Sequence, residues 1–459
     1  MIPKKISSRL FTAEQSLMGK KEIFKRLEIL NKTQYYNDDK LKELQWDKLK
    51  KLIKHSYETV PYYRSLLDSN GIKPDSINSY DDYRKIPILT RKQISENRDL
   101  LISKEYKIED LKKASSSGST GEPLALYHTS DFKLWAKAHQ LRNYNWCGGY
   151  EIGDRFALLW GSEIYFKLKT YLDMFENKLM NRIEFNTFRL NEKYLLDMCK
   201  KLSKFKPKLI SSYPSSLLFM SEVMLKHNIN VSPAAIQTTS ETLTQIDRKI
   251  ISERFNCKVM DKYGSRETNV IACECEEQMG MHINIENTFV EFLRDGKPVK
   301  PGEIGEIVVT NLNNYGMPLI RYAIGDLGIP LEEKCKCGRT LPLMRQLNGR
   351  ESDIITTVNG DMIDSYFFSY LLQDFKEIAY FQIVQTTLKD ITLNLVMNKE
   401  IEKKNFESKI TEKINFFTNN SFDIHYEYVD NIPIEKSGKR RITISKVPFE
   451  WGKMLSESK

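Results

Sequence analysis

A run of small hydroxyl residues and glycines is the segment of this chain best suited to hold an anion. Positions 114–123 read ASSSGSTGEP. Because these side chains have little bulk, the backbone N–H groups can close around phosphate oxygens, and the hydroxyls add donors. The same composition is typical of a flexible linker or a solvated turn. Taken alone, the segment fits both interpretations.

Five further polar motifs follow at wide spacing. They are SE at 240–241, YGSRE at 263–267, RYAIGD at 321–326, GR at 349–350 and KSGK at 436–439. Each has an ordinary explanation by itself. Ser240 and Glu241 could cap a helix over 243–255, Gly325-Asp326 fits a turn, and the basic residues near 439 fit a solvated patch. Only their order along the chain points to a shared site.

Two cysteine-rich segments offer metal ligands. Cys273-Glu274-Cys275 is followed by His282, and Cys335-Lys336-Cys337-Gly338 comes later. Four soft ligands of this kind suit a tetrahedral Zn²⁺ site, and a group of unligated thiols is the alternative.

The composition is that of a soluble globular protein. Of the 459 residues, 41% are hydrophobic and 29% are charged. No apolar run approaches the roughly 20 residues that span a bilayer, and the basic N-terminus lacks the apolar core of a secretory signal, so we expect a cytoplasmic protein without membrane insertion. The net charge of +9 is interleaved with acidic residues, which gives no indication of nucleic-acid binding. Seven cysteines in a reducing compartment argue against a disulfide framework.

The elements that would position these residues change in character along the chain. Residues 38–70 have helical periodicity, with a break at Val60-Pro61. Strand-like runs then alternate with helical ones, which predicts βαβ units, a mostly parallel sheet and ligands at the carboxyl ends of its strands. The predicted strands are 155–160, 208–213, 235–239 and 258–262, and the predicted helices are 215–228 and 243–255.

The last third of the chain predicts two further regions. Short β-like runs at 289–294, 305–310 and 319–323, separated by Gly-containing turns, indicate antiparallel β structure. After Gly349-Arg350, strands at 353–358, 380–385 and 391–396 alternate with helices at 365–376 and 401–417. We therefore predict a large N-terminal domain over 1–348 and a compact α+β domain over 349–459.

The ordered set of motifs resembles the adenylate-forming superfamily of acyl-CoA synthetases. The phenylacetate-CoA ligase and CapK-like branch is most similar, since it shares the features Val60-Pro61-Tyr62-Tyr63 and Ile86-Pro87. The resemblance covers roughly residues 40–445. It implies an α/β fold with mixed sheets and a β region in the large domain, and a small, mobile α+β C-terminal domain.

The resemblance implies an ATP- and Mg²⁺-dependent ligase that converts an organic carboxylate into acyl-AMP with release of pyrophosphate. Because charge builds up on phosphoryl oxygens, such catalysis relies on positioned cations and N–H donors. CoA is the expected acceptor. An amine acceptor, as in capsule or natural-product biosynthesis, is the alternative, and a catalytically inactive nucleotide-binding scaffold is a third hypothesis. The oligomeric state is not predicted.

The resemblance also assigns roles to residues. Ser116, Ser117, Gly118, Ser119, Thr120 and Gly121 would grip the β- and γ-phosphates, and Lys439 would reach the α-phosphate and the substrate carboxylate. Asp326 would hold the ribose hydroxyls, Tyr263, Gly264 and Ser265 would lie beside adenine, and Glu267 would hold Mg²⁺. Ser240 and Glu241 match a segment near the nucleotide, and Arg350 matches the arginine of the interdomain motif. Arg266 departs from the usual Thr or Ser, so its role as an anion clamp is open.

For the metal, the set Cys275, His282, Cys335 and Cys337 matches the one carried by zinc-containing members of the branch, and Cys273 is left over.

The acyl pocket is less clear. Tyr144, Trp146, Trp160, Tyr213, Pro214 and Thr238 lie where the family has pocket-lining segments, but aromatic residues there are commonly core. His139 is either an acyl-transfer residue or structural.

Overall fold

The computed structural model describes most of the chain. It covers residues 2–17, 19, 21–115, 124–160, 171–187, 192–350, 355–358, 362–363, 368, 371–372, 375, 377–398, 402–418, 420–433 and 441–447. Among these residues, no helix combines the length and the apolar character needed to cross a membrane.

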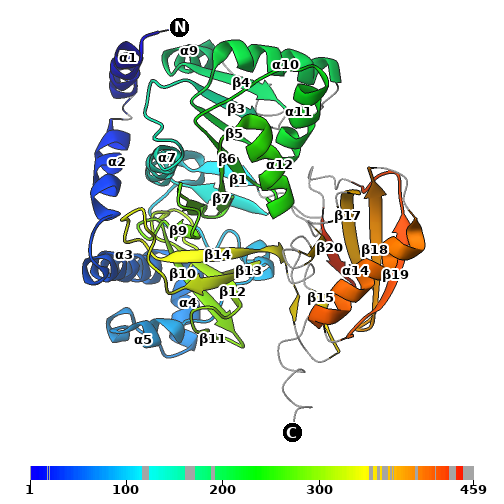
Figure 1. Cartoon of the computed structure of the whole chain (residues 1–459). Helices are drawn as coiled ribbons and strands as arrows, with labels where there is room; N and C mark the ends of the chain where they lie inside the picture. The colour runs from blue at the N-terminus through cyan, green and yellow to red at the C-terminus, as the bar shows by residue number, and fades with distance from the viewer. Residues whose placement is uncertain are drawn as a thin grey trace.

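A 12-stranded sheet forms the centre of the molecule, and half of it is parallel (Figure 1). The parallel strands are ordered β4-β3-β5-β6-β7. They are β3 (Phe156–Trp160), β4 (Arg182–Asn186), β5 (Leu209–Ser212), β6 (Ala235–Thr239) and β7 (Lys258–Ser265). The sequence prediction of a βαβ region is confirmed here, and each predicted strand agrees with its observed bounds to within three residues.

The antiparallel half continues the same sheet, because β7 pairs with β8 in the antiparallel direction. From there the order is β8-β9-β14-β13-β12-β10-β11. The bounds are β8 (Asn269–Glu274), β9 (Met281–Ile283), β10 (Thr288–Arg294), β11 (Lys297–Pro298), β12 (Gly305–Asn311), β13 (Tyr322–Leu331) and β14 (Leu343–Arg350). The predicted strand at 319–323 is wrong in its bounds, since β13 begins at Tyr322 and runs on through Gly325 and Asp326.

Helices cover both faces of the parallel half. Apolar residues of α10 (Glu192–Phe205), α11 (Pro214–Lys226) and α12 (Gln245–Phe255) pack in one cluster with Leu159 and Val259. The alternate residues Leu158 and Met260 face the other way and pack with Tyr144 of α7 (Ser130–Asn145). The two faces of the sheet are therefore called the α12 face and the α7 face. A further helix, α9 (Tyr171–Leu179), precedes β4.

The N-terminal region is helical and runs down one side of the molecule (Figure 1). Its helices are α1 (Lys4–Leu17), α2 (Glu22–Thr33), α3 (Asp38–Thr59), α4 (Pro61–Ser69), α5 (Tyr80–Arg84) and α6 (Arg91–Glu96). The predicted break at Val60-Pro61 is confirmed, because Val60 is extended and Pro61 starts α4.

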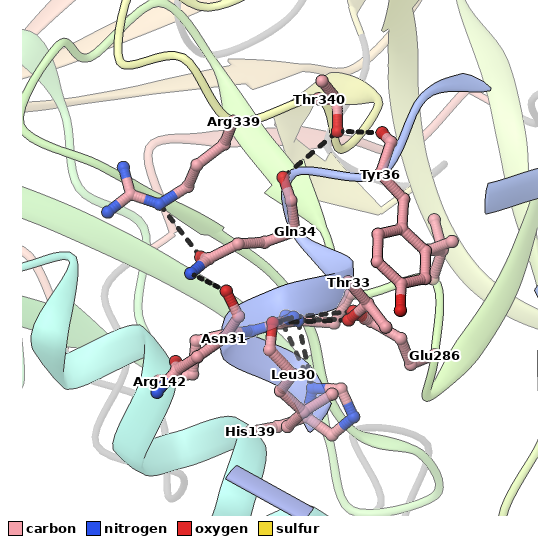
Figure 2. A network of polar contacts seen from close by, with 12 residues as sticks. Leu30, Asn31, Thr33, Gln34, Tyr36, His139, Arg142, Glu286, Arg339 and Thr340 are labelled. Carbon is pink, nitrogen blue, oxygen red and sulfur yellow. Dashed lines mark hydrogen bonds and ion pairs between the residues drawn. The ribbon is translucent and has the colours of Figure 1, made fainter. Parts of the chain in front are cut away.

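A buried polar network fastens α2 and α7 to the β region (Figure 2). Arg142 of α7 forms two bonds with the carboxylate of Glu286, at 2.6 and 3.0 Å, and Thr33 at the end of α2 donates to the same carboxylate. Burial alone would raise the pKa of Glu286, but Arg142 lowers it to about 2. Since a buried charge is tolerated only when paired, this network fixes the position of α7 on its side of the sheet.

A second, four-stranded sheet lies beside the large one and ends the described chain (Figure 1). Its order is β19-β18-β17-β20, with α14 (Lys403–Thr418) packed on it. The strands are β17 (Ile378–Gln385), β18 (Asp390–Met397), β19 (Asp423–Tyr428) and β20 (Thr443–Ser445), and β15 (Ile355–Thr356) pairs with β16 (Met362–Ile363) nearby. The expected small α+β C-terminal unit is confirmed. Most of the predicted helix at 365–376 lies outside the described residues.

Candidate functional site

The hydroxyl-rich loop is flanked by a two-stranded hairpin. β1 (Lys112–Ser115) and β2 (Ala125–His128) pair antiparallel, with Ser115 opposite Ala125. The predicted phosphate-binding residues between them, Ser116, Ser117, Gly118, Ser119, Thr120 and Gly121, lie outside the described residues. The described hairpin brings the two ends of this loop close together.

The YGSRE motif occupies the end of β7 and the turn into β8. Gly264 is required there, because a Cβ at this position would lie 2.4 Å from the carbonyl oxygen of Asn269. The side chain of Ser265 bonds to Thr268, accepting from its N–H at 3.2 Å, and so closes the turn. The motif is thus a tight connection at the carboxyl end of the last parallel strand.

Two predicted nucleotide residues meet across the sheet. The hydroxyl of Tyr263 on β7 donates to the Asp326 carboxylate on β13 at 2.8 Å. Tyr263 is buried, and burial together with the charge of Asp326 raises its pKa well above the ordinary value. Arg350 lies opposite Asp326 in the register of β13 and β14, although its side chain is not among those described. One side-chain hydrogen bond and one backbone pairing therefore bring three separate motifs together.

Glu267, in the turn after β7, has a basic neighbour that sequence reasoning missed. Its carboxylate is 3.9 Å from the guanidinium of Arg91, and only 6% of Glu267 is exposed. Arg91 begins α6, directly after Leu89 pairs with Tyr322 of β13. The capping pattern Thr90-x-x-Gln93 predicts a helix start at Arg91, but nothing in the local sequence indicates its contact with Glu267.

The hairpin side of the site carries excess positive charge. Arg266 is exposed, and its charge contributes to lowering the pKa of Lys133 and of His128, where burial is the larger cause and brings His128 to about 4. Both ring nitrogens of His128 are buried without a hydrogen-bond partner among the described residues. A cationic surface beside the hydroxyl-rich loop favours an anionic ligand.

The other residues predicted to lie near the nucleotide are Ser240, Glu241 and Lys439. Ser240 is exposed and has a left-handed backbone, with φ of 70°. Glu241 accepts from the backbone N–H and the hydroxyl of Ser215, so it caps the start of α11. The open alternative that Ser240 and Glu241 cap the helix at 243–255 is wrong, because Thr244 caps α12. Lys439 lies outside the described residues.

The four predicted zinc ligands converge. Their ligand atoms all lie within 4.8 Å of one another. Cys275 Sγ is 3.5 Å from Cys335 Sγ, and His282 Nε2 is 3.4 Å from the sulfurs of both Cys275 and Cys337. A tetrahedral zinc with ordinary Zn–S and Zn–N bonds needs ligand separations of roughly 3.3–3.8 Å.

One thiol of this cluster is poised to ionise, whereas burial raises the pKa of Cys275 and of Cys335. Burial would raise the pKa of Cys337, but a hydrogen bond from His282 and the backbone of Arg339 outweigh it and lower the pKa to about 5. A thiolate is the form that binds zinc. Cys273 is not part of the cluster, as expected, and faces Gln237 instead.

The candidate pocket residues divide between two environments. The rings of Trp160 and Tyr213 lie 4.9 Å apart in a tilted arrangement at the carboxyl ends of β3 and β5. Thr238 is fully buried and donates to Asp261 on the α12 face. Trp146 is buried and bonds to Gln34, while His139 is buried beside Arg142 and Asn284. Burial lowers the pKa of His139 to about 3. His139 belongs to the network of Figure 2, and Trp146 is joined to that network through Gln34.

Comparison with known proteins gives consistent matches. A family model described as the CapK C-terminal domain matches residues 355–446. Protein CapK of Staphylococcus aureus is 25% identical over 417 residues, which is 88% of this chain and 89% of the relative. A phenylacetate-coenzyme A ligase of Thermus thermophilus is 26% identical over 391 residues, covering 82% of this chain and 86% of the relative.

Solved structures show the same fold. A 2-hydroxyisobutyryl-CoA ligase in the postadenylation state, bound to 2-HIB-AMP, matches with a TM-score of 0.73 and 18% identity over 87% of this chain and 88% of the other. In its thioesterification state, with CoA present, the TM-score is 0.60, at 17% identity over 90% and 91% of the two chains. The fold and the relatives define an enzyme of the adenylate-forming ligase class. Within that class, the chain is similar to the branch that contains the phenylacetate-CoA ligases and CapK.

Proposed function

We propose that this enzyme activates an organic carboxylate as acyl-AMP at the expense of ATP and then transfers the acyl group to the thiol of CoA. A carboxylate oxygen attacks the α-phosphorus, and the bond to the bridging oxygen of pyrophosphate breaks. The acyl-AMP has AMP as its leaving group, so a thiolate can then displace AMP and form the thioester.

The bond between Tyr263 and Asp326 is the observation that carries this proposal. It joins the YGSRE and RYAIGD motifs at one point, 2.8 Å apart, from strands that are distant in sequence. The Asp326 carboxylate has acceptor capacity beyond this bond and would take the ribose hydroxyls. The Tyr263 ring beside it would support adenine.

Charged side chains among the described residues support the proposed binding of the ATP phosphates. Glu267 would hold Mg²⁺ with a carboxylate oxygen, a donor that this ion prefers, and Arg91 keeps that carboxylate in place. When bound, the metal would neutralise charge on the phosphate oxygens. Arg266 adds a cation near the β1–β2 hairpin, where the hydroxyl-rich loop at 116–121 would grip the β- and γ-phosphates. Lys439 would bind the α-phosphate. Arg350 would lie at the junction of the two sheets.

The decisive test is carboxylate-dependent exchange of labelled pyrophosphate into ATP, run over a library of acids. We expect exchange with a subset of acids and none without acid, and we expect E267Q to abolish it. An exposed control, Glu253→Gln on α12, should keep full exchange. Wild-type protein without exchange for any acid would contradict the proposed activity and favour a nucleotide-binding scaffold.

The alternative acceptor is an amine. The match to CapK extends over more of the chain than the match to the phenylacetate-CoA ligase, 88% against 82%, which keeps this candidate open. Adding CoA or an amine, such as an amino sugar, to the enzyme with its preformed acyl-AMP decides between them. Formation of a thioester supports CoA, and formation of an amide alone supports the alternative.

A further inference from the structure

Lys262 is a partly buried lysine near the carboxyl end of a parallel strand. It is the residue before Tyr263 on β7, a central strand of the large sheet. Met260 packs on the α7 face and Val259 on the α12 face. Because side chains alternate along a strand, Lys262 lies on the α7 face with Met260, whereas Asp261 lies on the α12 face.

The described neighbours of Lys262 offer no negative charge on that face. In the register of the sheet Lys262 lies between Thr239 on β6 and Cys273 on β8. Gln237 donates to the sulfurs of Cys147 and Cys273, at 3.4 and 3.5 Å. Burial raises the pKa of Cys273 well above its ordinary value, so this thiol is neutral. On this face the register partners of Lys262 are therefore a threonine and a neutral thiol.

The nearest carboxylate is directed elsewhere. Asp261 accepts from the Thr238 hydroxyl at 2.8 Å on the opposite face. Among the residues that the structure describes, no hydrogen bond or ion pair of the Lys262 ammonium is found. The side chain is half-buried, and desolvation lowers its pKa. A partly desolvated cation without a partner is unfavourable, and an anion supplied by a ligand would remove that cost.

The location is one where ligands bind in this type of sheet. Lys262 lies close to the carboxyl end of β7, and crevices at the carboxyl ends of parallel strands hold ligands in open α/β sheets. Trp160 is associated with the same α7-face cluster, and its ring lies 4.9 Å from that of Tyr213 in a tilted arrangement. A placed cation at this end of the sheet suits a site that selects for a charged substituent.

We propose that Lys262 determines substrate specificity by selecting acids with a second anionic group, such as a second carboxylate, far from the carboxylate that reacts with ATP. This inference rests on the proposed acyl-AMP-forming function. It makes Lys262 a contact for the non-reacting end of the acid, separate from the nucleotide contacts of Tyr263 and Asp326.

Matched pairs of acids test the inference. Pyrophosphate exchange is measured with glutarate against pentanoate, adipate against hexanoate, and 4-carboxyphenylacetate against phenylacetate. For at least one pair, wild-type kcat/KM should favour the dicarboxylate by about 10- to 100-fold, the range expected for a hydrogen bond to a charged group. K262M should lose this preference through a higher KM for the dicarboxylate, with the KM for ATP unchanged, and K262R should largely keep it.

Lys258 provides the control, because it is an exposed lysine at the other end of the same strand and donates to the carbonyl of Glu276. K258M should keep the wild-type preference. A wild-type enzyme that favours the monocarboxylate of every pair would overturn the inference. So would K262M if it slowed both members of a pair equally, because Lys262 would then act on the reacting carboxylate or the phosphates.

Calorimetric binding of the same acids separates this inference from the proposed function. A dicarboxylate that binds wild-type protein and not K262M supports the Lys262 contact, even where no exchange is seen and the ligase proposal fails. If exchange occurs and the dicarboxylate binds K262M as tightly as it binds wild-type protein, the ligase proposal stands and the role of Lys262 is contradicted.

Discussion

At the scale of single residues, the contact between Tyr263 and Asp326 unites two motifs that have no local reason to be related. Gly325-Asp326 looks like a turn in the sequence, yet Asp326 lies within β13, at a register shift next to Gly328. The bulge lets the strand continue through a glycine-containing segment. The carboxylate then faces the end of β7, where a nucleotide would lie.

Replacing Asp326 should therefore weaken ATP binding selectively. D326A removes acceptors of charge-assisted hydrogen bonds worth about 1.5–3 kcal/mol, so we expect KM for ATP to rise by about 10- to 100-fold with little change in KM for the acid. Y263F removes one neutral donor, and its effect should be smaller. Steady-state exchange kinetics measure both, with the exposed Asp75→Ala as control. An unchanged KM for ATP in D326A would assign the ribose contact elsewhere.

Residue identities could be predicted from the sequence where they form ordered motifs, but contacts could not. The zinc ligand set was expected, and the structure brings all four ligand atoms together. Arg91 was missed, because its significance arises only when the segment before α6 pairs with Tyr322. Lys262 was not singled out either, since a lysine in a strand draws notice only when its neighbours are known.

Asp261 makes folding stability depend on pH. Burial and the nearby charge of Glu274 raise its pKa from 3.8 to about 6. The folded protein therefore holds this proton more tightly than the unfolded chain, so the resulting stability is present below about pH 4 and is lost as the pH rises to about 6. The loss is on the order of 3 kcal/mol.

Asp261→Asn should remove this dependence, because the amide oxygen can still accept from Thr238 and carries no charge. Relative to wild type, the variant should gain stability as the pH rises from about 4 to about 7. Urea unfolding across that range measures the difference, with the exposed Asp430→Asn as control. A stability difference that stays constant with pH would show that Asp261 titrates alike in both states.

At the scale of elements, the cysteine and histidine cluster ties together parts of the antiparallel half that are separated in sequence. Cys275 follows β8, His282 lies in β9, and Cys335 and Cys337 precede β14. These strands are adjacent in the sheet. A metal there would act as a cross-link that restricts the unfolded chain and adds bonds to the folded one.

We expect about one zinc per chain in protein purified without chelator, and a lower Tm after the metal is removed. Cys337→Ser should reduce both the zinc content and the Tm. Cys257→Ser is the control, because Cys257 is a half-buried thiol outside the cluster. Metal analysis and thermal unfolding make the comparison. Freshly purified protein without zinc would refute the metal and leave a group of unligated thiols.

Strands could be predicted from the sequence where their hydrophobic pattern was strong. The buried strands β3, β5 and β6 are short apolar runs between helices, and each was predicted near its observed bounds. β13 was misplaced because glycines at 325 and 328 interrupt its pattern. The joining of the parallel and antiparallel halves into one sheet could not be predicted, because it depends on the tight turn after Gly264.

At the scale of the whole molecule, the small C-terminal sheet carries the segment in which Lys439 lies. The division of the chain at 348 and 349 remains a prediction, as does rotation of the small domain between the two half-reactions. Two states of one ligase with this fold match the chain to different degrees, as a change in domain arrangement would produce. If Lys439 serves only the first half-reaction, the two steps can be separated by mutation.

Lys439→Ala should reduce pyrophosphate exchange strongly, by roughly 100-fold or more, because removing a preorganised charge from a phosphoryl-transfer transition state costs about 3 kcal/mol or more. Acyl transfer from chemically prepared acyl-AMP to CoA should change much less, since the lysine would be withdrawn by then. Lys446→Ala, also in the small domain but after β20, is the control for general damage to that domain. Equal losses in both half-reactions would show that Lys439 stays at the site throughout, and the rotation would have to be abandoned.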